Sequence, residues 1–354
     1  MKINVKIENI DDELLFKRLK LRVGGKEITT PIKTGYKVVQ TPINEIFKKF
    51  DDQKIDKCLK DEKFERIVNS DIKRDSINGV NFFFVDYGSN KIPTQKQIEF
   101  LSDIQYEHSD VVITPILSKL TRELTEEKLL NTFMDITNKY IEIAETLNNK
   151  SIIGIIPRAM PRQFLEPIIK NYHNQGVTSF IVDSDGKSID SNPSWIRNLI
   201  RLLKDYDIFE GSFLYCINSY EGRFMKNANE ILAKDFISTG FGIDILGLNH
   251  LPPRMPSEAW AKIKAIRREN TYRLFNRATY GYVKKTEAGL RGMNIRKREE
   301  LKRFNIIEQH KETQVLQQKL KEENTVEDYI KNKKQVTDDL IKKIKNLRKK
   351  VLRR

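Results

Sequence analysis

The sequence predicts an α/β fold, specifically a (β/α)8 TIM-type barrel with an N-terminal β-hairpin region and a C-terminal basic helical extension. Three observations predict it. Strand patterns fill the first forty residues, six short apolar runs then alternate with helical stretches, and strand signals stop beyond about residue 270. An open doubly wound sheet is the alternative, which the absence of a Gly-x-Gly-x-x-Gly motif after the first strand disfavours.

The N-terminal region predicts antiparallel strands followed by helices. Residues 2–7 alternate between apolar and polar, and residues 19–23 lead through Gly24-Gly25 into residues 27–30. Two strand patterns joined by two glycines are typical of a β-hairpin. The highly charged residues 43–75 predict helices.

The barrel strands are predicted from runs rich in Val, Ile and Phe, which lie at residues 80–85, 110–114, 152–156, 177–182, 212–217 and 242–246. Nearly continuous apolar runs are typical of parallel strands that are buried on both faces. Helices are expected between these runs, near residues 94–107, 124–148, 161–174, 193–205 and 224–236. This alternation of strand and helix favours the barrel.

The C-terminal region predicts a long helix from residue 288 to 354 with a break near Asn324-Thr325. A narrow apolar stripe runs along it, formed by Leu316, Leu320, Val326, Ile330, Val336, Leu340, Ile344 and Leu347. Such a stripe packs on the parent domain or on a second subunit. The sequence therefore predicts two parts, the barrel with its hairpin over residues 1–285 and the basic helical tail over 286–354.

Charge and cysteine content narrow the classes of function. The net charge is +15, and residues 291–354 hold 20 basic against 10 acidic residues. Clustered positive charge favours a polyanion such as nucleic acid, and a solvated lysine-rich helix is the alternative. No segment approaches the roughly 18 apolar residues of a membrane span, and the N-terminus lacks a signal-peptide pattern. Two cysteines, Cys58 and Cys216, are too few for a disulfide framework or a thiolate zinc site, so a reducing cytoplasm, no metal and no cofactor are expected.

Polar residues follow the predicted strands, where parallel barrels carry their functional groups. They are Asp86, Tyr87, Arg158, Asp183, Asp185, Asn218, Asp244, Asn249 and His250. Carboxylates act as nucleophile, general base or acceptor from a base edge, and arginines hold phosphate. The structural alternative is that Asp183 and Asp185 belong to an ordinary turn or helix cap, since Asp-x-Asp-Gly is common in turns.

The order of these motifs resembles that of the tRNA-guanine transglycosylase superfamily, whose barrel enzymes exchange a base in a nucleic acid. The resemblance spans roughly residues 20–255. It is carried by degenerate motifs at residues 25–31, 84–89, 97–113, 154–158, 176–186, 242–244 and 252–254. The resemblance implies a barrel, a nucleic-acid substrate and Asp86 as the first essential aspartate.

Three departures concern the chemistry. The family's base-reading aspartate falls near Ile116, its nucleophile falls at Gly247, and its Cys-x-Cys-x-x-Cys…His zinc site is absent. The chain is therefore expected to be a divergent branch that rebuilt its site from Asp183, Asp185 or Asp244, similar to relatives that insert deazapurines into DNA. The alternative is a barrel that lost catalysis and kept binding.

The resulting hypothesis is exchange of a purine for a 7-deazapurine base in tRNA or DNA. Asp244 or Asp183 would attack C1′ to form a glycosyl-enzyme, and Asp86 would serve as general acid or base. Substrate-binding roles fall to Tyr87, Arg158, Asp185, Asn218, Asn249 and His250. The expected nucleic-acid contacts are Arg162, Arg223, Arg254, Arg267, Arg268, Arg273 and Arg277. The competing hypothesis is a non-catalytic nucleic-acid-binding partner subunit of a transglycosylase-type machine, as a homodimer or within a heteromeric complex.

Overall fold

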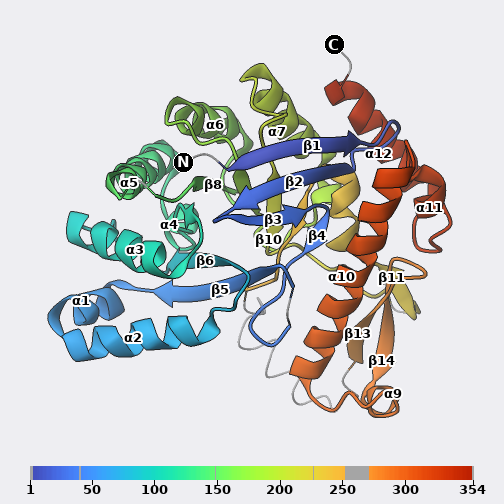
Figure 1. The fold of residues 1–354 in the computed structure, drawn as a ribbon, viewed down its shortest axis with the longest axis horizontal. Helices are drawn as coiled ribbons and strands as arrows, with labels where there is room; N and C mark the ends of the chain where they lie inside the picture. The colour runs from blue at the N-terminus through green and yellow to red at the C-terminus, as the bar shows by residue number, and fades with distance from the viewer. Residues whose placement is uncertain (1–2, 40, 148, 226, 252–270, 353–354) are drawn as a thin grey trace.

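The computed structural model describes residues 3–39, 41–147, 149–225, 227–251 and 271–352, which form an α/β structure (Figure 1). Its centre is a parallel sheet of six strands. In spatial order these are β4 (Ile32–Lys33), β12 (Ile245–Leu246), β10 (Leu214–Ile217), β9 (Phe180–Asp183), β8 (Ile152–Pro157) and β7 (Val112–Ile113). The α/β class is thus confirmed.

A second parallel pair, β5 (Ile43–Phe50) and β6 (Val80–Tyr87), lies next to both edges of this sheet. Gly35, just after β4, forms an isolated parallel bridge to Asn44 of β5. Asp86 of β6 forms another with Ile116, just after β7. Each edge of the six-stranded sheet therefore has one strand of the pair as its neighbour.

All six predicted apolar runs form strands, for the reason that the sequence suggested. Along β6 the side chains alternate between two hydrophobic clusters, with Phe82 and Phe84 in the inner one. Phe83 and Val85 lie in the outer one, against the helices. Because both faces are buried, residues 82–85 form an unbroken apolar run between Asn81 and Asp86.

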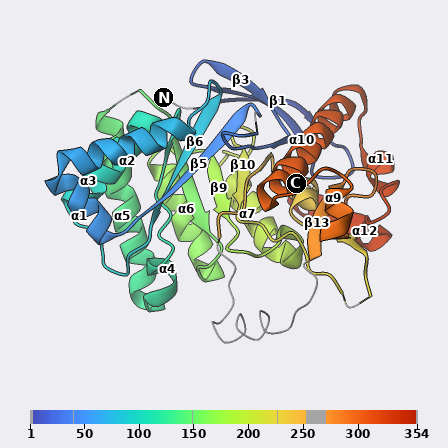
Figure 2. The ribbon, with the colours of Figure 1, turned by 90° about the horizontal axis from the view of Figure 1, so that it is seen from below.

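Helices cover the outer face of the strands (Figure 2). The α-helices that follow strands β5 to β9 are α1 (Asp52–Lys60), α2 (Glu62–Asp75), α3 (Gln95–His108), α4 (Leu120–Glu123), α5 (Glu126–Thr146), α6 (Leu165–Asn174) and α7 (Pro193–Asp205). Short 3-10 helices lie at η1 (Arg162–Phe164), η2 (Ile189–Ser191) and η3 (Phe236–Phe241). Local signals set their starts: Thr94 and Gln97 form a capping box on α3, and Asn192 caps α7 with Pro193 in its first turn.

The predicted N-terminal hairpin is confirmed. Strands β1 (Asn4–Ile10), β2 (Lys17–Val23) and β3 (Lys26–Thr29) form an antiparallel sheet, and Gly24 and Gly25 at the β2–β3 turn have φ of +54° and +79°. Glycine adopts such angles at little cost. The apolar face of this sheet belongs to the inner cluster of the strands, so it covers one end of that cluster.

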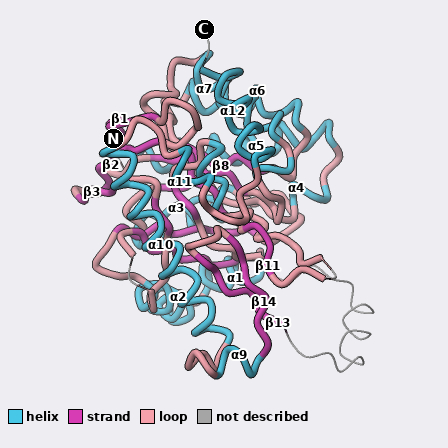
Figure 3. The backbone as a smooth tube through the Cα atoms, turned by 90° about the vertical axis from the view of Figure 1, so that its right-hand side faces the viewer, coloured by secondary structure: helices cyan, strands magenta, loops and turns pink. Residues whose placement is uncertain are grey.

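Three expectations for secondary structure are wrong. Residues 43–50 form β5 rather than a helix. Their charged residues suggested an exposed helix, but two lysines lie near the end of the strand and Glu45 is buried inside the fold. The helix expected at 224–236 is absent, since residues 230–232 form β11 (Glu230–Leu232). Strands also continue past residue 270, as β13 (Thr271–Asn276) and β14 (Gly281–Thr286), and β14 pairs with both β13 and β11 (Figure 3). Basic residues within these strands obscured the apolar pattern that would have predicted them.

The C-terminal region is helical and breaks near Asn324-Thr325 as predicted, but it also breaks at residues 292–297 and 332–337, where the sequence predicted continuous helix. It consists of α9 (Glu287–Arg291), α10 (Arg298–Glu322), α11 (Glu327–Lys331) and α12 (Asp338–Leu352). All eight residues of the predicted apolar stripe are buried. They belong to the same hydrophobic cluster as the helices around the parallel strands, so the stripe packs on the parent domain.

This packing predicts that the tail and the strands unfold together. Ile344 of α12 is fully buried, so Ile344→Ala should lower the free energy of unfolding by about 2–5 kcal/mol through lost contacts and a cavity. Urea denaturation followed by circular dichroism and by fluorescence should give coincident shifts. The exposed neighbour Lys342→Ala is the control, expected to stay within about 0.5 kcal/mol of wild type. A separate low-urea transition confined to helix signal would contradict this coupling.

Candidate functional site

Four of the predicted strand-end residues meet at one narrow cavity. Asp183 ends β9, and Pro157 of β8 and Ile217 of β10 pair beside it, so the carboxyl ends of these strands are level. The residues that line the cavity include Asp86, Asp183, Asp185 and Asn218. Its volume is ≈ 20 Å³, about enough for one water molecule. The structure therefore places two of the three expected catalytic aspartates together.

Asp183 is held in place by its neighbours on β9 and β10. Asn218 Nδ2 donates to Asp183 Oδ1 at 2.8 Å, and the backbone N–H of Asp185 donates to the same oxygen at 3.1 Å. Burial raises the pKa of Asp183, which these two hydrogen bonds oppose and the charges of Asp185 and Asp86 reinforce. The two donors stabilise the ionised form of this buried carboxyl, the form in which it could act as a nucleophile.

Asp86 faces the same cavity from β6. It is 6% exposed, and its Oδ1 has no hydrogen-bond partner among the described residues. Burial raises the pKa of Asp86, against the opposing hydrogen bonds of Ser118 and the charge of Lys49. Two neighbouring carboxyl groups with raised pKa values favour a state in which one holds a proton and the other does not. Such a pair can supply both an acid and a base.

An arginine does reach this cavity, although the sequence did not single it out. Arg122 of α4 pairs with Asp185, with 2.7 Å between the guanidinium nitrogen and Oδ1. Asp185 itself has φ of +50°, a left-handed conformation that aspartate tolerates in turns. The sequence around Arg122, Thr121-Arg122-Glu123, matches no motif, so the contact between Arg122 and Asp185 is visible only in the fold.

Glu45 is a central residue that sequence reasoning missed. The carboxylate of Glu45 is buried and accepts hydrogen bonds from Thr34 Oγ1 at 2.5 Å, from the Tyr215 hydroxyl and from Leu248 N at 3.0 Å. Its Oε2 also lies 2.6 Å from His250 Nε2. Burial would raise the pKa of Glu45, but the hydrogen bond and charge of His250, together with the two hydroxyls, lower it. Alternation of Ile43, Glu45 and Phe47 is the signal that would have placed Glu45 inside.

His250 connects Glu45 to the aspartate cavity. Its ring stacks on Phe47, with 4.4 Å between centroids and planes 8° apart. Its backbone N–H donates to Asn218 Oδ1 at 2.8 Å, and Asn218 in turn holds Asp183. Asn218 thus lines the cavity itself, and His250 lies beside it, which agrees with their expected place at the strand ends.

The expected position of Asp244 is wrong. Asp244 precedes β12, and its Oδ2 accepts from Leu214 N at the start of β10, so it lies at the opposite end of the strands from Asp183. The Lys17 ammonium lies 3.0 Å from the same oxygen, and both side chains are buried. Asp244 pairs with Lys17 of β2 and is unable to join the cavity of Asp86 and Asp183.

Tyr87 and Arg158 also point away from the cavity. Tyr87 is buried in the outer cluster, where its hydroxyl donates to Asp52 Oδ1 at 2.5 Å. Arg158 donates to Ser188 O at 2.9 Å and lies 5.2 Å from the Trp195 ring centroid. In a strand, successive side chains face opposite sides, so the residues next to inward-facing Asp86 and Pro157 turn outward. Their expected substrate-binding roles are not supported.

The predicted arginines have different surroundings. Arg162 and Arg223 are exposed. Arg273 pairs with Glu221 Oε2 at 3.2 Å and borders a second cavity, as does the exposed Asn249. Arg254, Arg267 and Arg268 lie outside the described residues.

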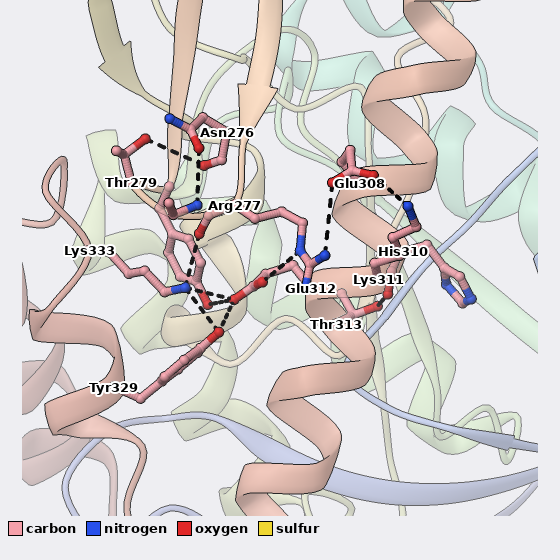
Figure 4. A network of polar contacts seen from close by, with 12 residues as sticks. Asn276, Arg277, Thr279, Glu308, His310, Lys311, Glu312, Thr313, Tyr329 and Lys333 are labelled. Carbon is pink, nitrogen blue, oxygen red and sulfur yellow. Dashed lines mark hydrogen bonds and ion pairs between the residues drawn. The ribbon is translucent and has the colours of Figure 1, made fainter.

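Arg277 is held in a polar network between the β13–β14 turn and the tail (Figure 4). Its Nε donates to Glu312 Oε2 at 3.1 Å. Glu312 Oε1 accepts from Tyr280, Tyr329 and Lys333 at 2.9, 2.5 and 3.1 Å. The charge of Arg277 is therefore paired within the protein, which disfavours its expected role at a phosphate.

The two positions that the family uses for chemistry are filled in other ways. Ile116 is buried and lines the narrow cavity as an apolar wall. A Cβ at Gly247 would lie 2.7 Å from Cys216 O and 2.7 Å from Ile217 Cγ2. Because real Cβ atoms do not approach so closely, position 247 excludes any side chain without a shift of the backbone.

Comparisons with known proteins add little to this geometry. No family model matches the chain, and no curated protein matches it. Among solved structures, the putative copper homeostasis protein CutC from Streptococcus agalactiae is 11% identical, with a TM-score of 0.26, over 48% of this chain and 89% of that one. This likeness is too weak to support a statement about function.

Two further properties concern the described residues alone. No group of three or more His, Cys, Asp or Glu side chains among them is arranged to hold a metal ion. None of their helices is both long and apolar enough to cross a membrane.

The raised pKa of Asp183 predicts a pH-dependent stability. The Asp183 carboxyl keeps its proton to higher pH in the folded protein than in the unfolded chain. The stability that this protonation contributes is therefore present below the ordinary pKa of aspartate, and it is lost as the pH rises through the pKa of the folded state. In urea denaturation, Asp183→Asn should therefore become more stable relative to wild type as the pH rises above about 4, the ordinary pKa of aspartate. The exposed Asp205→Asn should run parallel to wild type. A difference independent of pH for Asp183→Asn would contradict the buried carboxyl.

Proposed function

We propose that this protein is a base-exchange transglycosylase that replaces a purine with a 7-deazapurine in tRNA or DNA. The observation that carries the proposal is the meeting of Asp86 and Asp183 in one cavity, with burial raising the pKa of both. The motif order that resembles the transglycosylase superfamily supports the assignment, since Asp86 corresponds to its first essential aspartate.

The proposed architecture is a closed (β/α)8 barrel. The bridges Gly35–Asn44 and Asp86–Ile116 support it, because they join the strands of the β5–β6 pair to both edges of the six-stranded sheet. In such a barrel the active site lies at the carboxyl ends of the strands, which is where Asp183 and Asn218 stand.

The proposed mechanism uses one carboxyl group in each protonation state. Ionised Asp183 attacks C1′, the C1′–N bond breaks, and protonated Asp86 gives its proton to the departing base. Asp86 then takes a proton from the incoming 7-deazapurine, whose nitrogen attacks C1′ and releases Asp183. The target nucleotide has to leave its stack to reach the strand ends, so the ≈ 20 Å³ cavity marks the reacting centre and not the whole base site.

We place this activity in the cytoplasm, acting on nucleic acid. The buried free thiols Cys58 and Cys216 and the net charge of +15 support this setting. Exposed Arg162 and Arg223 are the described candidates for phosphate contacts.

The competing proposal is a non-catalytic nucleic-acid-binding partner subunit. The backbone around Gly247 favours it, because the family's nucleophile position has no room for a carboxylate. Ile116 likewise removes the family's base-reading carboxylate. Under this proposal Asp86 and Asp183 are buried remnants with no turnover.

Label incorporation separates the two proposals. Separate tRNA and DNA pools are incubated with the protein and a radiolabelled 7-deazaguanine-type base, and label in the polymer is counted. Asp86→Asn and Asp183→Asn should each lower incorporation by about 10²–10⁴-fold, since each removes a reacting group. Asp205→Asn is the matched control and should retain wild-type incorporation. No incorporation into either pool, with salt-sensitive binding to one of them, would favour the partner subunit.

A further inference from the structure

A cavity of about 710 Å³ lies beside the strand ends and takes no part in the proposed chemistry. Its walls come from β4, the segment after β12, strand β13 and the first turns of α10. Leu251 borders both this cavity and the narrow one at Asp183. Its size falls within the range of small-molecule sites, and a nucleotide fits such a volume.

At the floor of the cavity, the carboxylates of Asp235 and Glu221 lie near the buried Lys33, and one carboxylate oxygen is an unused acceptor. Asp235 Oδ2 accepts from the Tyr282 hydroxyl at 2.8 Å and from Gln309 Nε2 at 3.0 Å. Its other oxygen, Oδ1, is buried without a hydrogen-bond partner among the described residues. Glu221 lies nearby, and its pKa is raised mainly by burial and secondly by the negative charge of Asp235. A ligand that donates N–H groups would satisfy this floor.

Two further buried polar atoms of the lining lack partners in the described part of the chain. They are the hydroxyls of Tyr36 and Ser219. Buried polar atoms in folded proteins are nearly always paired with protein, water or ligand. Their presence together with Asp235 Oδ1 around one cavity indicates a site built for a polar guest.

The walls and the mouth carry different chemistry. Tyr272 and Phe224 supply aromatic wall, with the Arg273 guanidinium 5.8 Å from the Phe224 ring centroid. Arg298, Glu299 and Lys302 on α10 line the cavity and are exposed, so two cations and one carboxylate stand at its mouth. Exposed cations over an aromatic wall suit a planar base with an attached phosphate.

We propose that this cavity is a second nucleotide site, for a nucleotide whose base presents neighbouring N–H donors. The base edge donates to Asp235 Oδ1, the ring lies against the aromatic wall, and the phosphate meets Arg298 and Lys302. The ligand is either a free mononucleotide or a nucleotide unit of a nucleic acid, which share this chemistry. The site does not depend on turnover at Asp86 and Asp183.

Calorimetric titration of the full chain tests the site. Guanosine monophosphate, whose N1–H and amino group are adjacent, should bind, and adenosine monophosphate should bind at least about tenfold more weakly. Asp235→Asn should weaken guanosine monophosphate by a similar factor, while Asp183→Asn should leave it unchanged. A guanine-containing trinucleotide that binds more tightly than the mononucleotide, and competes with it, identifies the polymer as the source. Tighter binding of the mononucleotide than of the trinucleotide identifies the free nucleotide as the ligand.

An exposed residue provides a variant that does not endanger folding. Lys302→Gln should weaken guanosine monophosphate roughly two- to fivefold and leave guanosine unchanged, because only the phosphate contact is lost. Lys311→Gln, an exposed lysine on the same helix, should change neither. Absence of binding, equal binding of the two monophosphates, or unchanged binding by both Asp235→Asn and Lys302→Gln would overturn the proposal. Failure of label incorporation with binding intact would overturn the transglycosylase alone.

Discussion

The carboxylate of Glu45 is the contact on which the arrangement at the strand ends depends. Burying an ionised carboxylate costs several kcal/mol unless hydrogen bonds compensate it. Here the donors come from separate elements: Thr34 after β4, Tyr215 of β10, and Leu248 with His250 after β12. One side chain on β5 therefore fixes three other segments at once. Through His250 and Asn218, the same contact sets the position of Asp183.

Two cavities with different chemistry result from this arrangement. The narrow cavity holds two buried carboxyl groups, and burial raises the pKa of both. Its volume is about that of one water molecule. The larger one has carboxylates and Lys33 at its floor, and Arg298, Glu299 and Lys302 at its mouth. The paired carboxyl groups and the larger cavity are thus separate in space, and Leu251 borders both cavities.

The C-terminal tail is part of the folded core. Its apolar stripe completes the outer cluster, and Gln317 donates to the carbonyl groups of Thr29 and Pro31 at 2.9 Å. Part of its charge is used internally, because Lys333 pairs with Glu312, and Lys345 with Glu13 and Glu327. A count of basic residues therefore overstates the charge that the tail can offer to a phosphate backbone.

The sequence by itself determined the α/β class, the six buried strands, the hairpin and the break in the tail, since each follows from local periodicity and turn chemistry. It also indicated the carboxyl ends of the strands, where Asp86, Asp183, Asp185 and Asn218 meet. Glu45, Arg122 and the cavity floor at Asp235 were beyond it, because their partners come from distant segments. Only the tertiary structure decided which way Tyr87 and Arg158 face and at which end Asp244 lies. A shift of one residue along a strand reverses the face of a side chain, and degenerate motifs do not fix strand boundaries to one residue.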